Sequence, residues 1–175
     1  MIRTARNIGD LDCSNLKVSS NGLVKTKNGW TPGWTTTHGY KQVKVQRKGR
    51  HAHQLILNTF YPSPLPGLEP DHINGNRTDN RLENLRWVSR SINCLLKPAK
   101  GFSFSKRYNK YQVLLRGKWI GIYTTTTEAK YAYEYHKAIA LREAREELVG
   151  QVMDLGFTRQ QAIDSLHWTE FDDIM

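Results

Sequence analysis

The chain has 175 residues, of which 38% are hydrophobic, and a formal net charge of +10. This length allows one ordinary domain or two or three small ones, and the lack of any apolar run of about 18 residues excludes a membrane protein as the expected class. The first residues lack the apolar stretch of a secretory signal, and the two distant cysteines favour reduced thiols, so we expect a cytoplasmic protein.

The charge is divided unevenly along the chain. Residues 1–145 hold 25 Lys and Arg against 9 Asp and Glu, whereas residues 146–175 hold one basic residue, Arg159, against seven acidic ones. A basic body attracts phosphate backbones and releases their counterions on binding. The charge therefore favours nucleic acid as the partner, with a generic basic protein as the alternative.

Residues 1–60 predict a β-rich module, because short alternating segments are separated by residues typical of hairpin turns. The predicted turns are at Asn21-Gly22, Asn28-Gly29 and Lys48-Gly49. Residues 53–60 predict a short helix, and the proline-rich stretch 61–67 that follows predicts a rigid connector.

A cluster of basic side chains surrounds the predicted hairpin that contains the alternating residues 40–46. The cluster consists of Lys41, Lys44, Arg47, Lys48 and Arg50. Two strands that carry such side chains suit contacts with DNA phosphates. A solvated, charged ribbon is the alternative.

The segment from residue 70 to residue 93 holds side chains suited to phosphodiester hydrolysis. That reaction needs a base that titrates near neutral pH, as imidazole does, and a hard divalent cation held by oxygen ligands. Asp71 and His72 are adjacent on a predicted strand, so their side chains point to opposite sides. Asn93 follows Ser89, a predicted N-cap, and therefore lies in the first turn or so of a helix.

These residue types predict distinct roles. Asp71 and the amide oxygen of Asn93 can hold one divalent ion and leave coordination positions for water and phosphate, as Mg²⁺ prefers. Asn84 precedes a predicted strand at 85–88 and can tie the intervening loop to the backbone. Four loop residues are expected to shape the loop rather than to catalyse: Asn76, Arg77, Asp79 and Asn80. Two arginines are either phosphate contacts or solvated surface residues: Arg86 and Arg90.

This segment resembles the HNH (ββα-metal) nuclease family, in the Asp-His…Asn…Asn variant common among bacteriophage homing endonucleases. The resemblance is carried by the Asp71-His72 pair, an Asn-Gly-Asn turn at 74–76, an Asn-Leu-Arg-Trp-Val run at 84–88 and Asn93. It implies a β-hairpin and a helix that grip one Mg²⁺ or Mn²⁺, with His72 as the general base. Asp71 and Asn93 are then the metal ligands, and Asn84 orients the site. The last position is Asn rather than the His of the family name.

The preceding residues resemble the small β-rich module that often comes before the HNH core in these phage enzymes. The similarity covers residues 18–24, Gly39-Tyr40 and residues 51–56. The family commonly has Val-His-Arg-Leu-Val where this chain has Ala-His-Gln-Leu-Ile at 52–56. The resemblance makes His53 a candidate contact of the scissile phosphate, with a packed structural histidine as the alternative.

Residues 101–145 predict three strands followed by a helix. The strands are expected near 102–105, 111–116 and 119–123, and the helix from about residue 126, where Thr125 and Glu128 have the spacing of a capping box. Apolar residues on one face of the helix predict that it packs across the strands.

The same residues resemble the AP2 DNA-binding domain. The matching features are Gly-Phe-Ser-Phe at 101–104, Lys-Tyr-Gln-Val at 110–113, Gly-Ile-Tyr at 121–123 and the helical run 128–133. The resemblance implies that the sheet lies in the major groove and supplies site preference. The candidate contacts are Lys106, Arg107, Lys110, Arg116, Lys118 and Trp119. Packing in the core is the alternative for Trp119.

Residues 146–175 predict an acidic tail with two short helices, at 146–154 and 159–167. Gly156 separates them, and Thr158 with Gln161 predicts a second capping box. The acidity argues against DNA contact. Three roles stay open: a helix that caps the rest of the fold, a docking site for a protein partner, and a lid that competes with DNA for the basic surface.

Together these features predict an α+β protein of four parts. The parts are a β-rich N-terminal module (1–60), a ββα-metal HNH core (61–98), an AP2-like sheet plus helix (99–145) and a short acidic helical tail (146–175). The expected function is hydrolysis of double-stranded DNA by a site-preferring nickase of homing type that acts as a monomer. The alternatives are a non-cleaving, sequence-specific DNA-binding regulator and a protein-interaction adaptor that acts through the tail.

Overall fold

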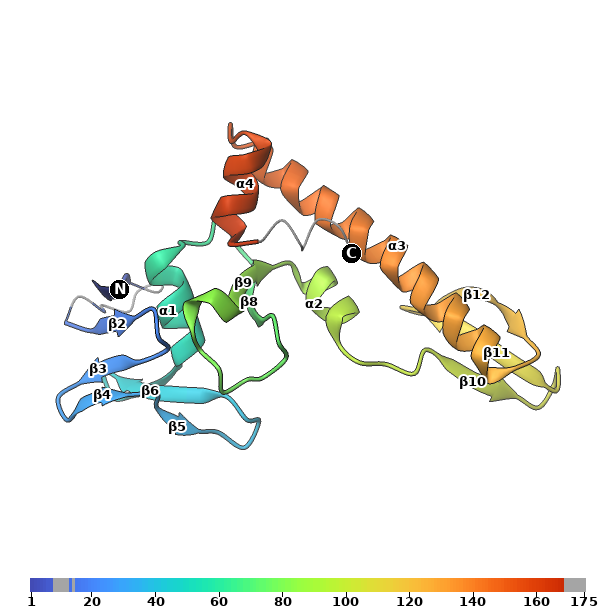
Figure 1. The fold of residues 1–175 in the computed structure, drawn as a ribbon, viewed down its shortest axis with the longest axis horizontal. Coiled ribbons are helices and arrows are strands. Elements are labelled where there is room, and N and C mark those ends of the chain that lie inside the picture. The colour runs from blue at the N-terminus through green and yellow to red at the C-terminus, as the bar shows by residue number, and fades with distance from the viewer. Residues whose placement is uncertain (8–12, 14, 169–175) are drawn as a thin grey trace.

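Two small antiparallel sheets form the N-terminal part of the computed structural model, which describes residues 1–7, 13 and 15–168 (Figure 1). The first sheet consists, in spatial order, of β1 (Ile2–Thr4), β2 (Lys17–Ser19), β3 (Val24–Thr26) and β4 (Gly29–Thr31). The second consists of β5 (Trp34–Thr35), β6 (Lys41–Val45) and β7 (Lys48–His51). Helix α1 (Ala52–Phe60) packs against both sheets.

The hairpin between β6 and β7 turns earlier than predicted, so the expected turn at Lys48-Gly49 is wrong. Gln46 and Arg47 form the turn, with φ of 48° and 66°, and Lys48 and Gly49 belong to β7. A two-residue turn in which both φ angles are positive matches the twist of the flanking strands. The resulting register keeps Val43 and Val45 buried on one face of the strand.

A two-stranded antiparallel ribbon lies at the centre of the molecule. It pairs β8 (Glu69–His72) with β9 (Leu85–Val88), and a single 3₁₀ turn (Leu82–Asn84) leads into β9. All four side chains of β9 are buried. Helix α2 (Arg90–Leu96) follows, and the Ser89 side chain accepts a hydrogen bond from the Ile92 backbone N–H, which confirms the predicted N-cap.

The predicted three strands and helix are present in the C-terminal part. The strands β10 (Phe102–Ser105), β11 (Lys110–Leu115) and β12 (Lys118–Tyr123) form an antiparallel sheet, and α3 (Thr126–Met153) packs across it. Both bonds of the capping box between Thr125 and Glu128 are formed at the start of α3. These elements, the N-terminal sheets and the central ribbon together give the α+β class expected from the sequence.

Helix α3 is continuous over 28 residues and runs through the expected boundary at residue 145, so the separate helix predicted at 146–154 is wrong. The helical spacing of buried positions runs through that boundary, with Arg145, Leu148, Val149 and Val152 all buried. The helix ends at Met153, and Gly156, which has a φ of 92°, lies in the turn that follows. No described helix is long and apolar enough to cross a membrane.

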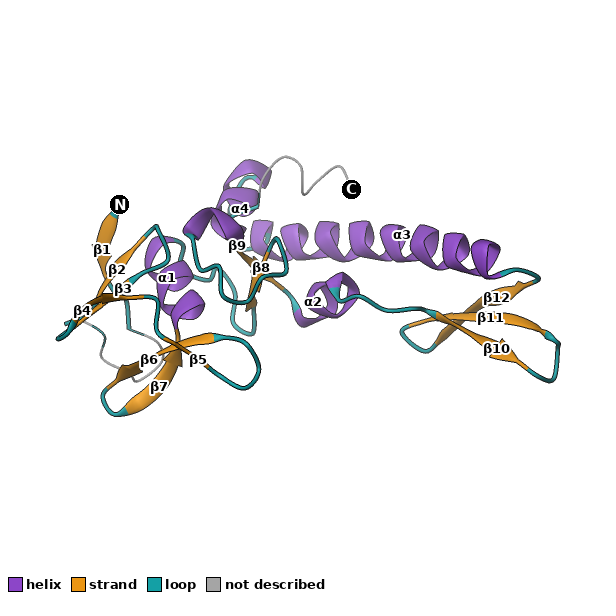
Figure 2. Ribbon diagram, turned by 60° about the horizontal axis from the view of Figure 1, so that its bottom comes forward, coloured by secondary structure: helices purple, strands orange, loops and turns teal. Residues whose placement is uncertain are grey.

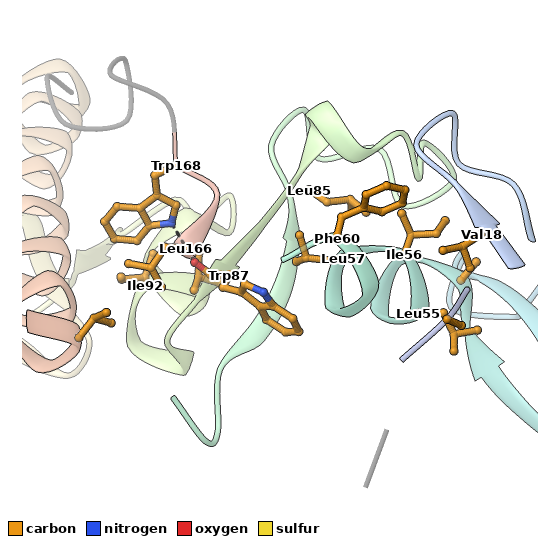
Figure 3. Close-up of a cluster of buried hydrophobic side chains, with 14 of the residues drawn as sticks. Val18, Leu55, Ile56, Leu57, Phe60, Leu85, Trp87, Ile92, Leu166 and Trp168 are labelled. Carbon is orange, nitrogen blue, oxygen red and sulfur yellow. Dashed lines mark hydrogen bonds between the residues drawn. The ribbon is translucent and has the colours of Figure 1, made fainter. Parts of the chain in front are cut away.

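Two hydrophobic cores share α2 and α3. The first core joins the N-terminal sheets, α1, the ribbon and the C-terminal end of α3 (Figure 3). The second lies between the β10–β12 sheet and the start of α3. Helix α2 contributes Ile92 to the first core and Leu95 to the second. Leu141 and Ala144 of α3 pack against both, and Figure 2 shows α3 running alongside α2 toward the sheet.

The C-terminal segment caps the ribbon, which is one of the three roles considered for it. Helix α4 (Arg159–Leu166) begins with the predicted capping box. The His167 ring stacks on Tyr61 at 4.1 Å, and its Nδ1 lies 2.5 Å from the Leu85 carbonyl oxygen. The indole N–H of Trp168 donates to the Trp87 carbonyl at 2.8 Å, as Figure 3 shows. The tail residues after Trp168 lie outside the described residues.

We expect Trp168→Ala to lower the free energy of unfolding by about 3 to 5 kcal/mol, because it empties a buried indole site and removes the bond to β9. Urea denaturation followed by circular dichroism measures the change. Leu155→Ala is the matched control, since Leu155 is 55% exposed just before α4. Equal midpoints for Trp168→Ala and Leu155→Ala would contradict the capping role.

Candidate active site

A cleft of about 210 Å³ lies where the end of β8 meets α2. Its walls include Asp71 and His72 from β8 and Asn93 from α2. The structure therefore brings together the three side chains that the sequence predicted to act together. A larger hollow, of about 1030 Å³, lies among the N-terminal strands around Trp30 and Trp34, and none of the three is among its described lining residues.

Asp71 is held in place from the opposite strand of the ribbon. The register pairs Asp71 with Arg86, and the Arg86 Nε donates to Asp71 Oδ2 at 3.0 Å. The Arg86 side chain is only 6% exposed, so the reading of Arg86 as a solvated surface residue is wrong. Because Arg86 takes Oδ2, Oδ1 is the carboxylate oxygen that a metal ion would contact.

Asn93 is oriented by a residue that sequence reasoning missed. Its Nδ2 donates to Glu69 Oε2 at 2.5 Å. Glu69 stands two residues before Asp71, so both carboxylates lie on the same side of β8. The two-residue spacing of Glu69 and Asp71 is the sequence feature that could have indicated that Glu69 belongs to the site. With Nδ2 bound to Glu69, Oδ1 of Asn93 is the atom that can serve as a metal ligand.

His72 is buried, with 6% of its surface exposed, and its partner was also missed. The His72 Nε2 lies 3.0 Å from Oδ1 of Asn80, a residue expected only to shape the loop. With an amide oxygen as its partner, Nε2 carries the hydrogen and Nδ1 keeps the lone pair. The loop 74–81 is polar, so no feature of its sequence distinguishes Asn80 from its neighbours. The contact of Asn80 with His72 follows from the path of the loop in space.

Asn84 ties down the loop between the two strands. Its Oδ1 accepts from the backbone N–H of Asn74 at 3.0 Å, and its Nδ2 donates to the Asn74 side chain and to the Asp79 carbonyl. Asp79 in turn binds the Arg81 guanidinium, which holds the pKa of the Asp79 carboxyl at about 2. Asn84 thus contacts the loop that carries Asn80.

Tyr40 and two further histidines pack behind His72. The ring centroid of His53 lies 4.9 Å from that of His72 and 5.2 Å from that of His51. Burial, and then the proximity of His72 and His51, lower the pKa of His53 to about 3. His53 is therefore neutral at pH 7 and only 6% exposed, which supports the packed, structural alternative and not a phosphate contact.

The donor atoms in the cleft suit a hard divalent cation. One carboxylate and one amide oxygen from the protein leave most positions for water and phosphate, as Mg²⁺ and Mn²⁺ accept. Among the described residues no three His, Cys, Asp or Glu side chains gather into a metal-binding group. The fit thus depends on Asp71 together with the amide of Asn93.

Two comparisons with known proteins found matches. Residues 50–95 match the model of a family described as HNH endonuclease. This range is an HNH endonuclease domain. The structure titled "DNA binding and cleavage by the HNH homing endonuclease I-HmuI" is 29% identical over 45% of this chain and 49% of that chain, with a TM-score of 0.39. The chain thus spans about half the length of that solved chain. No curated protein matches it.

The family match begins at residue 50, earlier than the expected boundary between residues 60 and 61. The family match includes the last residues of β7 and the whole of α1. Helix α1 packs against both strands of the ribbon and contributes Leu55, Ile56 and Leu57 to the core that supports it. A boundary placed after α1 therefore separates the ribbon from one of its supports.

Most of the residues that were predicted to contact DNA outside this cleft are accessible to solvent. Exposed residues include Lys44 and Arg47 on the β6–β7 hairpin and Arg90 at the start of α2, while Lys41 and Arg50 are half-buried. On the C-terminal sheet and its turns the exposed set is Lys106, Arg107, Lys110, Arg116, Lys118 and Trp119. Trp119 is 50% exposed, so the alternative of core packing is wrong. Arg116 also donates to the Ser91 hydroxyl of α2 at 2.7 Å.

The buried His53 makes the stability of the protein depend on pH. Its folded pKa of about 3 lies below the ordinary value of 6.5, so between these values the unfolded chain binds a proton that the folded chain excludes. We expect the free energy of unfolding to fall by up to about 1.4 kcal/mol per pH unit as the pH drops below 6.5.

Urea midpoints measured across that range test this expectation, and His53→Gln should flatten the dependence. His38→Gln is the control, because His38 is exposed. An unchanged slope in His53→Gln would show that His53 is not the group that excludes the proton.

Proposed function

We propose that this chain is a divalent-metal-dependent DNA endonuclease of the HNH type. The observation that carries the proposal is that Asp71, His72 and Asn93 line one cleft within the segment that matches the HNH endonuclease family. The strongly basic composition of residues 1–145 supports DNA as the substrate.

Asp71 Oδ1 and Asn93 Oδ1 are the protein ligands of one Mg²⁺ or Mn²⁺ ion in this proposal. When bound, such an ion stabilises the charge that develops on the phosphate and on the leaving oxygen. Arg86 and Glu69 orient these two ligands through Asp71 Oδ2 and Asn93 Nδ2. Ligand pairs held in this way keep their geometry while the substrate enters.

His72 accepts the proton of the attacking water. Its Nε2–H donates to Asn80 Oδ1, which leaves the Nδ1 lone pair as the base. Asn84 acts through the loop, because its bonds to Asn74 and to the Asp79 carbonyl hold the segment that presents Asn80. Arg77 and Lys97 also line the cleft and supply positive charge for the phosphate.

The sheet β10–β12 is the proposed reader of DNA sequence, in the manner of AP2 domains. Its inner face packs on α3, and its outer face carries Leu114 opposite Trp119 and Gln112 opposite Ile122. A small sheet of this kind fits the major groove. One cleft in the described part of the chain gives one cut strand per monomer, so we propose a site-preferring nickase of homing type.

DNA binding without cleavage is a second candidate, favoured by one observation. The Arg86 guanidinium partly offsets the charge of the Asp71 carboxylate, which lowers its attraction for a divalent ion. If no ion binds at Asp71 and Asn93 on DNA, the chain acts as a sequence-specific regulator with a degenerate nuclease core. An adaptor role for the tail has less support, because Ala162, Ile163 and Leu166 of α4 are buried against the core.

We expect the wild-type protein with Mg²⁺ to convert supercoiled plasmid into nicked circles. His72→Ala should lower the nicking rate by roughly 10²- to 10⁴-fold, because the water loses its base. His38→Ala, which truncates an exposed histidine, should nick at the wild-type rate. Equal nicking by His72→Ala would defeat the assignment of the base. Tight binding to intact plasmid in both Mg²⁺ and Mn²⁺ would select the regulator.

The proposed role of the β10–β12 sheet, which we call the reading sheet, leads to a separate prediction about the sites that are nicked. Sequencing the nicked ends from a plasmid library should show preferred sites, and Trp119→Ala should weaken that preference by about 5- to 150-fold, because one base contact contributes about 1 to 3 kcal/mol. Tyr131→Ala is the matched control, since Tyr131 is an exposed aromatic residue on α3, away from the outer face of the sheet. Unchanged preferred sites in Trp119→Ala would rule out the sheet contact.

A further inference from the structure

The active cleft adjoins a second hollow on the side of α3. This hollow has a volume of about 350 Å³ and shares three wall residues with the cleft: Ile73, Arg86 and Leu96. Its other wall is the middle of α3, which runs beside α2 in Figure 2. The two hollows together form a groove that leads from Asp71 to α3, and we call it the α3 groove.

One face of α3 lines this groove. Glu134, Lys137, Leu141 and Arg145 contribute to the wall, and their spacings of three and four residues place them on the same side of the helix. Lys130 lies seven residues before Lys137, about two turns along the helix, so its exposed side chain continues the same face toward the sheet.

The described lining of the α3 groove is basic. It contains five Lys and Arg residues, namely Arg77, Arg86, Lys97, Lys137 and Arg145, against the two carboxylates of Asp71 and Glu134. Arg86 already donates a hydrogen bond to Asp71, and Arg145 is buried beside Trp168. Lys97 is exposed and Lys137 is half-buried, so their ammonium groups are the cations best placed to meet a ligand in the groove.

We propose that the DNA strand next to the cut runs through the α3 groove, with backbone phosphates on Lys97 and Lys137. The inference rests on the proposed function, which places the scissile phosphate beside Asp71. Lysine provides a point charge that suits phosphate irrespective of sequence. Helix α3 then contacts DNA directly, in addition to joining the reading sheet to the nuclease domain. Glu134 is the one residue of this helical face that opposes binding.

Phosphate contacts are measurable without knowledge of the recognition sequence. The wild type and each variant are titrated onto a fluorescein-labelled duplex of arbitrary sequence, in EDTA to prevent cleavage, over a series of KCl concentrations. Each phosphate contact contributes about 0.9 to the slope of log K against log salt. Lys137→Gln should lower the magnitude of the slope by about 1, whereas Lys137→Arg should keep it.

Two further variants sharpen the test. Arg142→Gln removes the same charge from an exposed position five residues along α3 that is not among the described lining residues of the groove, and it should leave the slope unchanged. Glu134→Gln should bind more tightly than the wild type, because it removes the opposing carboxylate. Thermal melting of each variant shows that the fold is intact.

The outcomes separate this inference from the proposed function. A wild-type slope in Lys137→Gln, or equal losses in Lys137→Gln and Arg142→Gln, overturns the α3 groove as a phosphate site. If Lys137→Gln lowers the slope while the wild type fails to nick in Mg²⁺ and Mn²⁺, the groove is supported and the nuclease proposal fails. A wild type that does not bind the duplex overturns both.

Discussion

The cleft lined by Asp71, His72 and Asn93 depends on the pairing of β8 with β9, because that register sets Asp71 opposite Arg86 and His72 beside the loop end. A two-stranded ribbon is not stable in water by itself. Here β9 is covered on both faces, and two of its carbonyls meet side chains from the far end of the chain, His167 and Trp168. A slip of one residue would turn the Asp71 side chain to the other face. The C-terminal segment therefore supports a site from which it is more than 70 residues distant in sequence.

Helix α2 is the second element on which the geometry of this cleft depends. It has only seven residues, too few to be stable without packing, yet it positions Asn93. Its two buried side chains enter different cores, Ile92 toward the ribbon and Leu95 toward the C-terminal sheet. The bond from Arg116 to Ser91 adds a polar tie between the sheet and α2. The proposed reading sheet and the proposed metal ligand are therefore parts of one packed unit, in which α3 spans both cores.

Features that depend on residues close together in the sequence were predicted. Most of the features that were not predicted depend on contacts between residues far apart in the sequence. The capping boxes at Thr125 and Thr158 and the three strands of the C-terminal sheet were readable from spacing alone. The acidic composition after residue 145 indicated a new unit, although the helical spacing of buried residues continued unbroken. Asn80 became recognisable only when the loop was placed in space, whereas the spacing of Glu69 from Asp71 was present in the sequence and its contact with Asn93 was not. A packed His53 was one of the two alternatives that the sequence left open, and its packing against Tyr40 and His51 decides between them.

The central claim is that Asp71 and Asn93 hold one divalent ion between a strand and a helix. Anomalous diffraction from crystals of the protein grown with duplex DNA and Mn²⁺ tests it most directly. The account predicts one anomalous peak in contact with Asp71 Oδ1 and Asn93 Oδ1, with a phosphate oxygen completing the site. A DNA complex with no peak between these atoms, or with the ion bound by other residues, would contradict the account.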